Sequence, residues 1–233
     1  MDELSNTKGS QYYVRFMYIF IRVKSQLKIV EQPNVSQVFD PMLQGTTLEG
    51  RIIVALQKVS EAFRVLLWEK AKEHSLSPIQ IQIMIFIKYH PEEMCKVAYL
   101  AQEFNLTKAT ISDAVKTLIS KKVLRKAQCS YDNRSFVLSL TEGGDNVVND
   151  IESYTSDFNE SLQGVSDGSK PMLLQELMGI IYQLNKLNII THQRMCFTCN
   201  HYNGDRVNAH YCGFLQSRMD TKSLRIDCID YKR

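Results

Sequence analysis

Four cysteines crowd the last 38 residues of this 233-residue chain: Cys196, Cys199, Cys212 and Cys228. Their spacing is C-x2-C-x12-C-x15-C, and the first pair forms a chelating loop in which two thiolates can bind one metal ion. The other two would complete a four-thiolate set, around which His201 and His210 are expected to pack or to form hydrogen bonds. The spacing therefore predicts one metal centre per chain.

The identity of the metal stays open between two alternatives. Zn²⁺ is the commoner choice for a closed four-thiolate site, and we favour a structural zinc. The second half of the pattern lacks the C-x2-C pair of a plain zinc ribbon, so an iron–sulfur cluster that senses redox state or iron is the alternative. The metal content and the visible spectrum of protein purified without oxygen would distinguish the two.

The segment 191–233 needs a cross-link because it holds few large apolar residues and cannot build a core of its own. A metal at a four-thiolate site can supply about 10 kcal/mol or more of folding free energy. Disulfides are disfavoured in a reducing compartment. The apolar stretch 12–23 is interrupted by Arg15 and Arg22, so it is too short for a membrane span, and we expect a cytoplasmic protein without a membrane segment.

Composition and motifs argue against three classes of protein: a disordered tail, a collagen-like fibre and an enzyme. Hydrophobic residues make up 44% and charged residues 23% of the chain, which excludes a disordered tail or a collagen-like fibre. A catalytic metal would need a general base, yet the tail has no H-E-x-x-H motif, no H-x-E…C-x-x-C motif and no glutamate after residue 176. We therefore expect no enzyme.

Hydrophobic periodicity predicts the helices that position these groups. One helix runs over 50–74, and a capping box that opens at Ser77 begins another, which ends near Tyr89. A short helix over 96–104, a tight turn and a helix over 108–122 form a helix-turn-helix.

After this motif the period changes to two. Residues 123–129 and 136–141 flank a polar turn and predict a β-hairpin, which would be a wing. Further helices are expected over 145–165 and 170–190. The fold class is thus mainly α (α+β), with a winged helix-turn-helix head on a helical stalk and a small cysteine-rich metal module.

Charge is distributed unevenly along the chain, although the formal net charge is only +3. Residues 95–135 hold eight basic and three acidic groups, whereas residues 142–190 hold two basic and eight acidic groups. A solvated charged face is the ordinary explanation of such a run. A basic patch that coincides with a helix-turn-helix and a hairpin instead favours binding to double-stranded DNA.

Two motifs carry a resemblance to a known family. Asp132-Asn133-Arg134-Ser135 is followed after four residues by Leu140-Thr141-Glu142-Gly143-Gly144, which fits a D-x-R-s…L-T-x-x-G wing pattern. Residues 105–112 fit the start of a recognition helix. On these motifs the segment 50–190 resembles the MarR family of winged-helix transcriptional regulators. The segments 1–49, an N-terminal extension and linker, and 191–233, the metal-binding tail, lie outside the family core.

The resemblance implies a homodimer whose first and last core helices interlock, with each head on one half-site of a palindromic operator. It also implies a possible small-molecule effector, which no residue here identifies. The expected function is sequence-specific transcriptional regulation. An interaction scaffold with a vestigial winged helix is the remaining alternative, and it would show no salt-dependent DNA binding.

Five residues are expected to contact DNA: Lys108, Thr110, Ser112, Lys116 and Arg134. The lysines would contact phosphate or guanine, the hydroxyls would face the major groove, and the arginine at the wing tip would enter the minor groove. Thr107 is expected to cap the helix. Asp113 departs from the family pattern and would accept a hydrogen bond from cytosine or cap locally. Cys95 and Cys129 are expected to be buried and structural.

Overall fold

A computed structural model describes residues 38–41, 47–129 and 132–233, and all statements on structure concern these residues. They fall into two compact units, one that ends at Phe63 and one that runs from Arg64 to Arg233. The apolar stretch 12–23 lies outside the described residues. No helix in the described ranges is both long enough and apolar enough to cross a membrane.

The boundary between the units falls within helix α2, Leu48–Glu73. In the first unit the hydroxyl of Thr47 accepts the amide of Gly50 at 3.1 Å and so caps the first turn. In the second unit Leu67 and Ala71 are buried in an apolar core. The predicted helix over 50–74 is confirmed.

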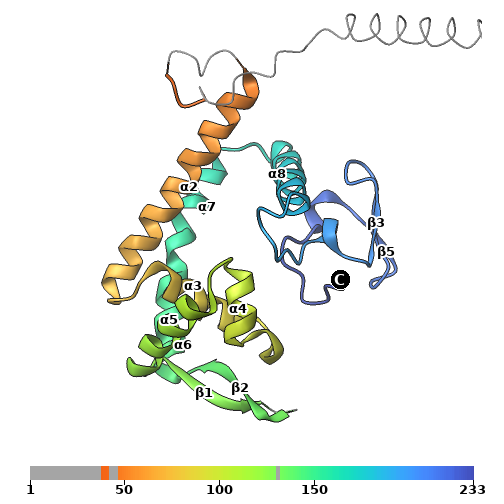
Figure 1. The fold of residues 1–233 in the computed structure, drawn as a ribbon. Coiled ribbons are helices and arrows are strands. Elements are labelled where there is room, and N and C mark those ends of the chain that lie inside the picture. The colour runs from red at the N-terminus through yellow and green to blue at the C-terminus, as the bar shows by residue number, and fades with distance from the viewer. Residues whose placement is uncertain (1–37, 42–46, 130–131) are drawn as a thin grey trace, which may run out of the picture. The chain divides into compact units, whose positions relative to one another are not determined.

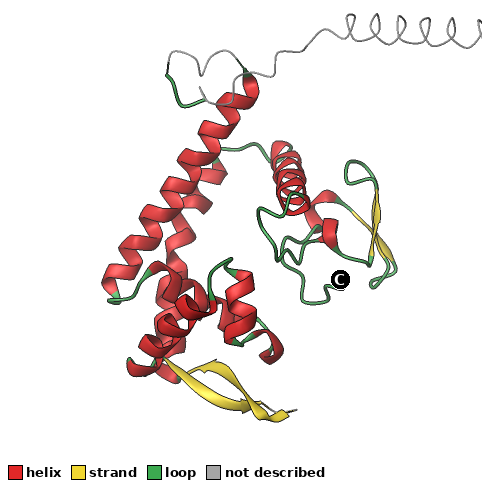
Figure 2. Ribbon diagram, viewed as in Figure 1, coloured by secondary structure: helices red, strands yellow, loops and turns green. Residues whose placement is uncertain are grey.

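After α2, the second unit continues with three helices, α3, α4 and α5 (Figures 1 and 2). Helix α3, Pro78–Tyr89, starts where Ser77 Oγ accepts the amide of Gln80 and Gln80 Oε1 accepts the amide of Ser77, as the sequence predicts. Helices α4, Val97–Glu103, and α5, Lys108–Ser120, follow and form the predicted helix-turn-helix.

A two-stranded antiparallel hairpin then forms the wing, as predicted (Figure 2). Strand β1, Leu124–Cys129, pairs with β2, Asp132–Leu140, in a register that places Leu124 opposite Leu140. The wing is tied to the head, because the amide of Leu138 donates to the carbonyl of Cys95 at 2.8 Å. One apolar core is shared by the wing, the C-terminal half of α2, helices α3, α4 and α5, and the following helix α6, Glu142–Ile151. It includes Ile81, Leu100 and Leu118.

The helices after the wing are more broken than predicted. Helix α6, Glu142–Ile151, is separated from α7, Ser156–Gln163, by the 3₁₀ helix η3, Glu152–Thr155. The single helix expected over 145–165 is therefore wrong in this detail. Helix α8 runs over Ser169–Lys186.

The cysteine-rich segment folds around a small sheet. This antiparallel sheet has the strand order β3, Tyr202–Gly204, β4, His210–Cys212, and β5, Ser217–Met219. In the sequence the 3₁₀ helix η4, Cys196–Thr198, precedes it, and the 3₁₀ helix η5, Thr221–Ser223, follows it.

A second apolar core stabilises this sheet. It holds Met195, Phe197 and Leu224 together with Met178 of α8, and each of these side chains is buried. The core therefore crosses residue 190, where the sequence predicts a domain boundary. We call residues 191–233 the cysteine module, and α8 packs on it.

Candidate nucleic-acid interface and candidate metal centre

Helix α5 presents one polar face to solvent. Its opposite face is buried in the head through Ile111, Ala114, Val115 and Leu118. Of the residues expected to contact DNA, Lys108, Thr110 and Lys116 are exposed on α5, and Ser112 is half-buried. The structure thus brings these four residues together on one helix.

The polar groups at the start of α5 are already engaged with each other. Thr107 Oγ1 accepts the amide of Thr110 at 3.1 Å, so the predicted cap is confirmed. The two threonine hydroxyls lie 2.9 Å apart. Asp113 forms an exposed ion pair with Lys116 at 3.0 Å, and such a pair is held weakly enough to exchange for a phosphate contact.

The wing contributes further basic groups. Arg125 and Lys126 of β1 are exposed, and Arg125 Nε donates to Ser139 Oγ at 3.1 Å. The side chain of Arg134, the fifth expected contact, lies outside the described part of the structure. Sequence reasoning counted Arg125 and Lys126 in the basic patch but did not single them out, although strand alternation and proximity to the wing turn were visible signals.

The L-T-x-x-G motif has a structural role at the base of the wing. Thr141 caps α6 by accepting the amide of Gly144 at 3.0 Å, and its hydroxyl donates to the carbonyl of Lys122 at 2.7 Å. A Cβ on Gly144 would lie 2.1 Å from the carbonyl oxygen of Val123. Only glycine allows α6 to begin this close to the first wing strand.

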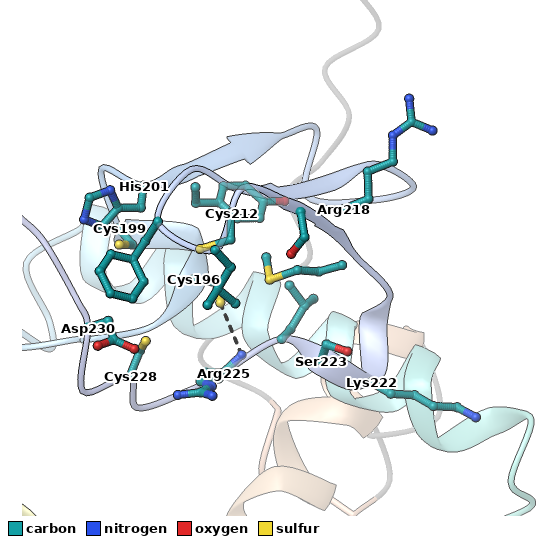
Figure 3. A pocket seen from close by; sticks show the side chains of 16 residues that line it. Cys196, Cys199, His201, Cys212, Arg218, Lys222, Ser223, Arg225, Cys228 and Asp230 are labelled. Carbon is teal, nitrogen blue, oxygen red and sulfur yellow. Dashed lines mark hydrogen bonds between the residues drawn. The ribbon is translucent and has the colours of Figure 1, made fainter.

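Figure 3 shows that the four cysteines of the module surround one space. They line a cavity of about 440 Å³, together with His201, Met219 and Leu224. Cys196 opens η4, Cys212 ends β4, and Cys228 lies in the loop near the C-terminal end. The predicted gathering of the four thiols is therefore present.

Backbone amides point at two of the sulfurs. The amide of Arg225 donates to Cys196 Sγ at 3.2 Å, which is the dashed line in Figure 3, and the amide of Lys232 donates to Cys199 Sγ at 3.4 Å. Burial raises the pKa of the Cys196 thiol, with a further contribution from the other three cysteines. Four thiols at one cavity fit zinc or an iron–sulfur cluster better than Mg²⁺ or Ca²⁺, although the carboxylate of Asp230 also lines this cavity.

The sulfur atoms are spread more widely than a single tetrahedral ion requires. Zn–S bonds of about 2.3 Å in a tetrahedron place neighbouring sulfurs about 3.8 Å apart. Among the residues whose side chains are described, no three cysteine sulfurs lie within 4.8 Å of one another. The four thiols would therefore have to move closer together to coordinate a single zinc ion.

The two histidines of the module differ in position. His201 lines the cavity, as Figure 3 shows. His210 is buried, and its Nδ1 lies 2.7 Å from the hydroxyl of Tyr202, within hydrogen-bond distance. Its Nε2 has no hydrogen-bond partner among the described residues. The expectation that His210 packs beside the site is consistent with this position.

A second cluster of metal-ligand types occurs on the head. Single ligand atoms of Glu73, His74 and Asp150 lie within 4.8 Å of one another. Lys70 already supplies a cation there, at 2.7 Å from Glu73 and 3.8 Å from Asp150. The hydrogen bond from His74 and the charge of Lys70 lower the pKa of Asp150. The cluster is explained as an ion-pair network.

A buried arginine joins the cysteine module to the head. Arg194 is 5% exposed and forms two bidentate ion pairs, with Glu103 of α4 at 2.5 and 3.1 Å and with Asp227 at 2.8 and 2.9 Å. It also donates to the hydroxyl of Tyr99 at 3.1 Å and lies over the ring of Phe86. Burial alone would lower the pKa of Arg194, but its bonds to Asp227 and Glu103 raise it.

Neighbouring residues reinforce this contact. His90 Nε2 lies 2.9 Å from Asp227 Oδ2. Thr191 donates to the carbonyl of Gln102, and His192 Nε2 lies 3.0 Å from Gln102 Oε1. Sequence reasoning missed this junction, because a single arginine beside a C-x2-C pair carries no recognisable pattern.

Comparisons with known proteins agree with this description of the head. The model of the MarR family matches residues 74–135. No curated protein matches the chain.

Many solved structures are similar to it, and two serve as examples. The transcriptional regulator PA3341 is 22% identical, with a TM-score of 0.51 over 58% of this chain and 98% of its own. The S. aureus MepR–DNA complex is 17% identical, with a TM-score of 0.49 over 56% of this chain and 96% of that one. The segment 74–135 thus matches the MarR family, and the described residues around it have the fold of a MarR-type winged helix-turn-helix.

Proposed function

We propose that the chain is a sequence-specific DNA-binding transcriptional regulator. The observation that carries this proposal is the exposed polar face of α5, with Lys108, Thr110 and Lys116, in a MarR-type winged helix. The helix supplies groups for the major groove, and its lysines supply phosphate contacts. Arg125 and Lys126 extend the positive charge onto the wing, where Arg134 is proposed to enter the minor groove.

The proposal includes a homodimer on a palindromic operator. Large apolar side chains remain exposed on α2, α7 and α8: Ile52, Val59, Phe63, Leu162, Leu173 and Ile180. Such side chains are typical of an interface between subunits. Two-fold symmetry would then match two half-sites of one operator. A small-molecule effector stays a prediction.

We also propose that the four cysteines of the module hold a metal centre. The four-thiolate set favours a structural zinc, and an iron–sulfur cluster, which places several irons and sulfides between the thiolates, is the alternative. The centre would supply the cross-link that the small core around Phe197 and Leu224 needs.

DNA binding is tested by titrating the full-length protein with duplex DNA at several salt concentrations. Lys116→Ala should weaken binding and reduce the slope of log K against log salt by about 0.9, because one phosphate contact is lost. Lys170→Ala is the matched control, since Lys170 forms an equally local ion pair, with Asp167, outside the winged head. Affinity that does not depend on salt would contradict the proposal.

The metal centre is tested by purifying the protein without oxygen and measuring its metal, sulfide and visible spectrum. Brown protein with iron and acid-labile sulfide supports the cluster, and colourless protein with one zinc per chain supports the structural site. Cys228→Ser should lose metal and make the module sensitive to protease. Full metal content in that variant would contradict the four-cysteine assignment.

A further inference from the structure

The junction around Arg194 joins the two candidate sites of the chain. We propose that Arg194 is a positioning residue through which occupancy of the cysteine centre controls DNA affinity, with the occupied form binding DNA more tightly. This inference rests on the proposed function, because it requires both a metal centre and DNA binding. It adds the regulation that connects them.

On the module side, Arg194 is attached to the segments that carry two of the cysteines. It lies two residues before Cys196, and Asp227 lies immediately before Cys228. The amide of Cys228 donates to the carbonyl of Arg194 at 2.9 Å, and the amide of Cys196 donates to the carbonyl of Arg225 at 2.9 Å. A centre that binds Cys196 and Cys228 together would hold these two segments in register and so hold Asp227 against Arg194.

On the head side, Arg194 contacts the helix that positions α5. Glu103 is the last residue of α4, and only the residues 104–107 separate it from the recognition helix. The guanidinium also lies over Phe86 of α3, 5.3 Å from the ring centroid, and Phe86 packs edge-on against Phe104 in the same turn. Arg194 therefore contacts the end of α4 directly, and Phe104 at the start of the turn indirectly through Phe86.

The burial of Arg194 makes this contact depend on both carboxylates. The arginine and Glu103 are 5% and 15% exposed, so neither charge is well solvated. One of the two carboxylates comes from the head and the other from the module. A buried charge that loses one of its partners is strongly destabilised, so movement of Asp227 would release Arg194 toward water and weaken its hold on Glu103.

The direction of the effect follows from preorganisation. A docked module fixes the C-terminal end of α4 through Glu103 and, by separate hydrogen bonds from Thr191 and His192, through Gln102. When this end is already fixed, the turn before α5 loses less conformational entropy as the protein binds DNA. Loss of the centre should therefore reduce DNA affinity, and DNA should in turn increase the affinity of the module for its metal by the same factor.

The test first selects a DNA duplex from a random pool with the wild-type protein. It then measures, under nitrogen, the dissociation constant of this duplex for two samples of the full-length chain, one with its metal centre occupied and one treated with a chelator. The wild type should bind more tightly when occupied, by about 10-fold. Glu103→Gln keeps the shape of the side chain and removes its charge, so the ratio should fall toward one while metal content per chain stays unchanged. Asp167→Asn, which breaks the exposed pair with Lys170, should leave the ratio unaltered.

Tyr99→Phe serves as a milder second variant, because it removes one hydrogen bond to Arg194 and keeps both ion pairs. It should reduce the affinity ratio between occupied and chelator-treated protein by less than Glu103→Gln does. If Glu103→Gln does not fold, the ratio measured for Tyr99→Phe tests the inference. A wild-type ratio of one or below, or a ratio that neither variant changes, overturns the inference. Absence of salt-dependent DNA binding, or of metal, in the wild type would instead overturn the proposed function.

Discussion

Replacing Gly144 by alanine perturbs the junction between the wing and helix α6. The new Cβ would lie 2.1 Å from the carbonyl oxygen of Val123 and 3.2 Å from a methyl group of Leu140. Since carbon and oxygen atoms approach to about 3.3 Å, the backbone must move by about 1 Å. The same carbonyl accepts the amide of Thr141 at 3.1 Å, so this movement strains the first turn of α6.

The magnitude follows from two opposed effects. Overpacking against a backbone atom costs about 1–3 kcal/mol, and alanine gains up to about 1 kcal/mol over glycine in a helix. Gly143 is the matched control, because its Cβ would meet nothing closer than Thr141 Oγ1 at 3.8 Å. We therefore expect Gly143→Ala to be neutral or stabilising and Gly144→Ala to be destabilising, with a difference of about 2 kcal/mol.

The assay is urea unfolding of the full-length variants, followed by the fluorescence of Trp68, the single tryptophan of the chain. Trp68 lies on α2 between Leu67 and Ala71, both of which pack in the head core, so its signal reports on the head. Equal free energies of unfolding for the two variants, or greater stability of Gly144→Ala, would refute the argument from the close approach.

Three further predictions concern other parts of the chain. Burial raises the pKa of the Cys95 thiol to about 11, so the thiol should resist alkylation in the folded state. The free energy of unfolding should fall between pH 9 and 11, and it should fall less steeply in Cys95→Ala than in the wild type. The carboxylate of Asp205 accepts three backbone amides, which lower its pKa to about 2. Asp205→Ala should therefore speed hydrogen exchange of the amides at 207–209. In the wild type the protection of these amides should be lost only as the pH falls from 3.8 toward 2. Met178→Ala should cost about 2–5 kcal/mol in the cysteine module, whereas the same change at exposed Met172 should have little effect on the thermal midpoint.

Much of the winged head could be predicted because its signals are local. The capping box at Ser77, the threonine cap at Thr107 and the change to a period of two after residue 122 each act within a few residues. The break at Glu152–Thr155 could not be predicted, since this segment contains no proline or glycine to mark it. Met178 lies at helical spacing from Leu174, Ile181 and Tyr182, which pack on the same core, but the distant segment that this face packs against could not be predicted from the period.

The candidate sites divide in the same way. Cysteine spacing predicted that four thiols gather at one place, and they line one cavity. The separation of their sulfurs could not be predicted, because it depends on the loops that carry Cys199 and Cys228. Lys116 and Asp113 lie one helical turn apart, so their ion pair could have been predicted from the sequence. The junction at Arg194 joins residues that no periodicity connects.

The contacts of the Arg194 junction also set an order of events during synthesis of the chain. Arg194 lies 91 positions after Glu103, and Asp227 lies 137 positions after His90. The apolar core of the head is complete once Tyr154 has been made. At about 5–20 residues per second the ribosome needs about 4–15 s more to reach Asp227. All residues of the head core, α5 included, are therefore synthesised seconds before Asp227, and docking of the cysteine module on the head is the last long-range step.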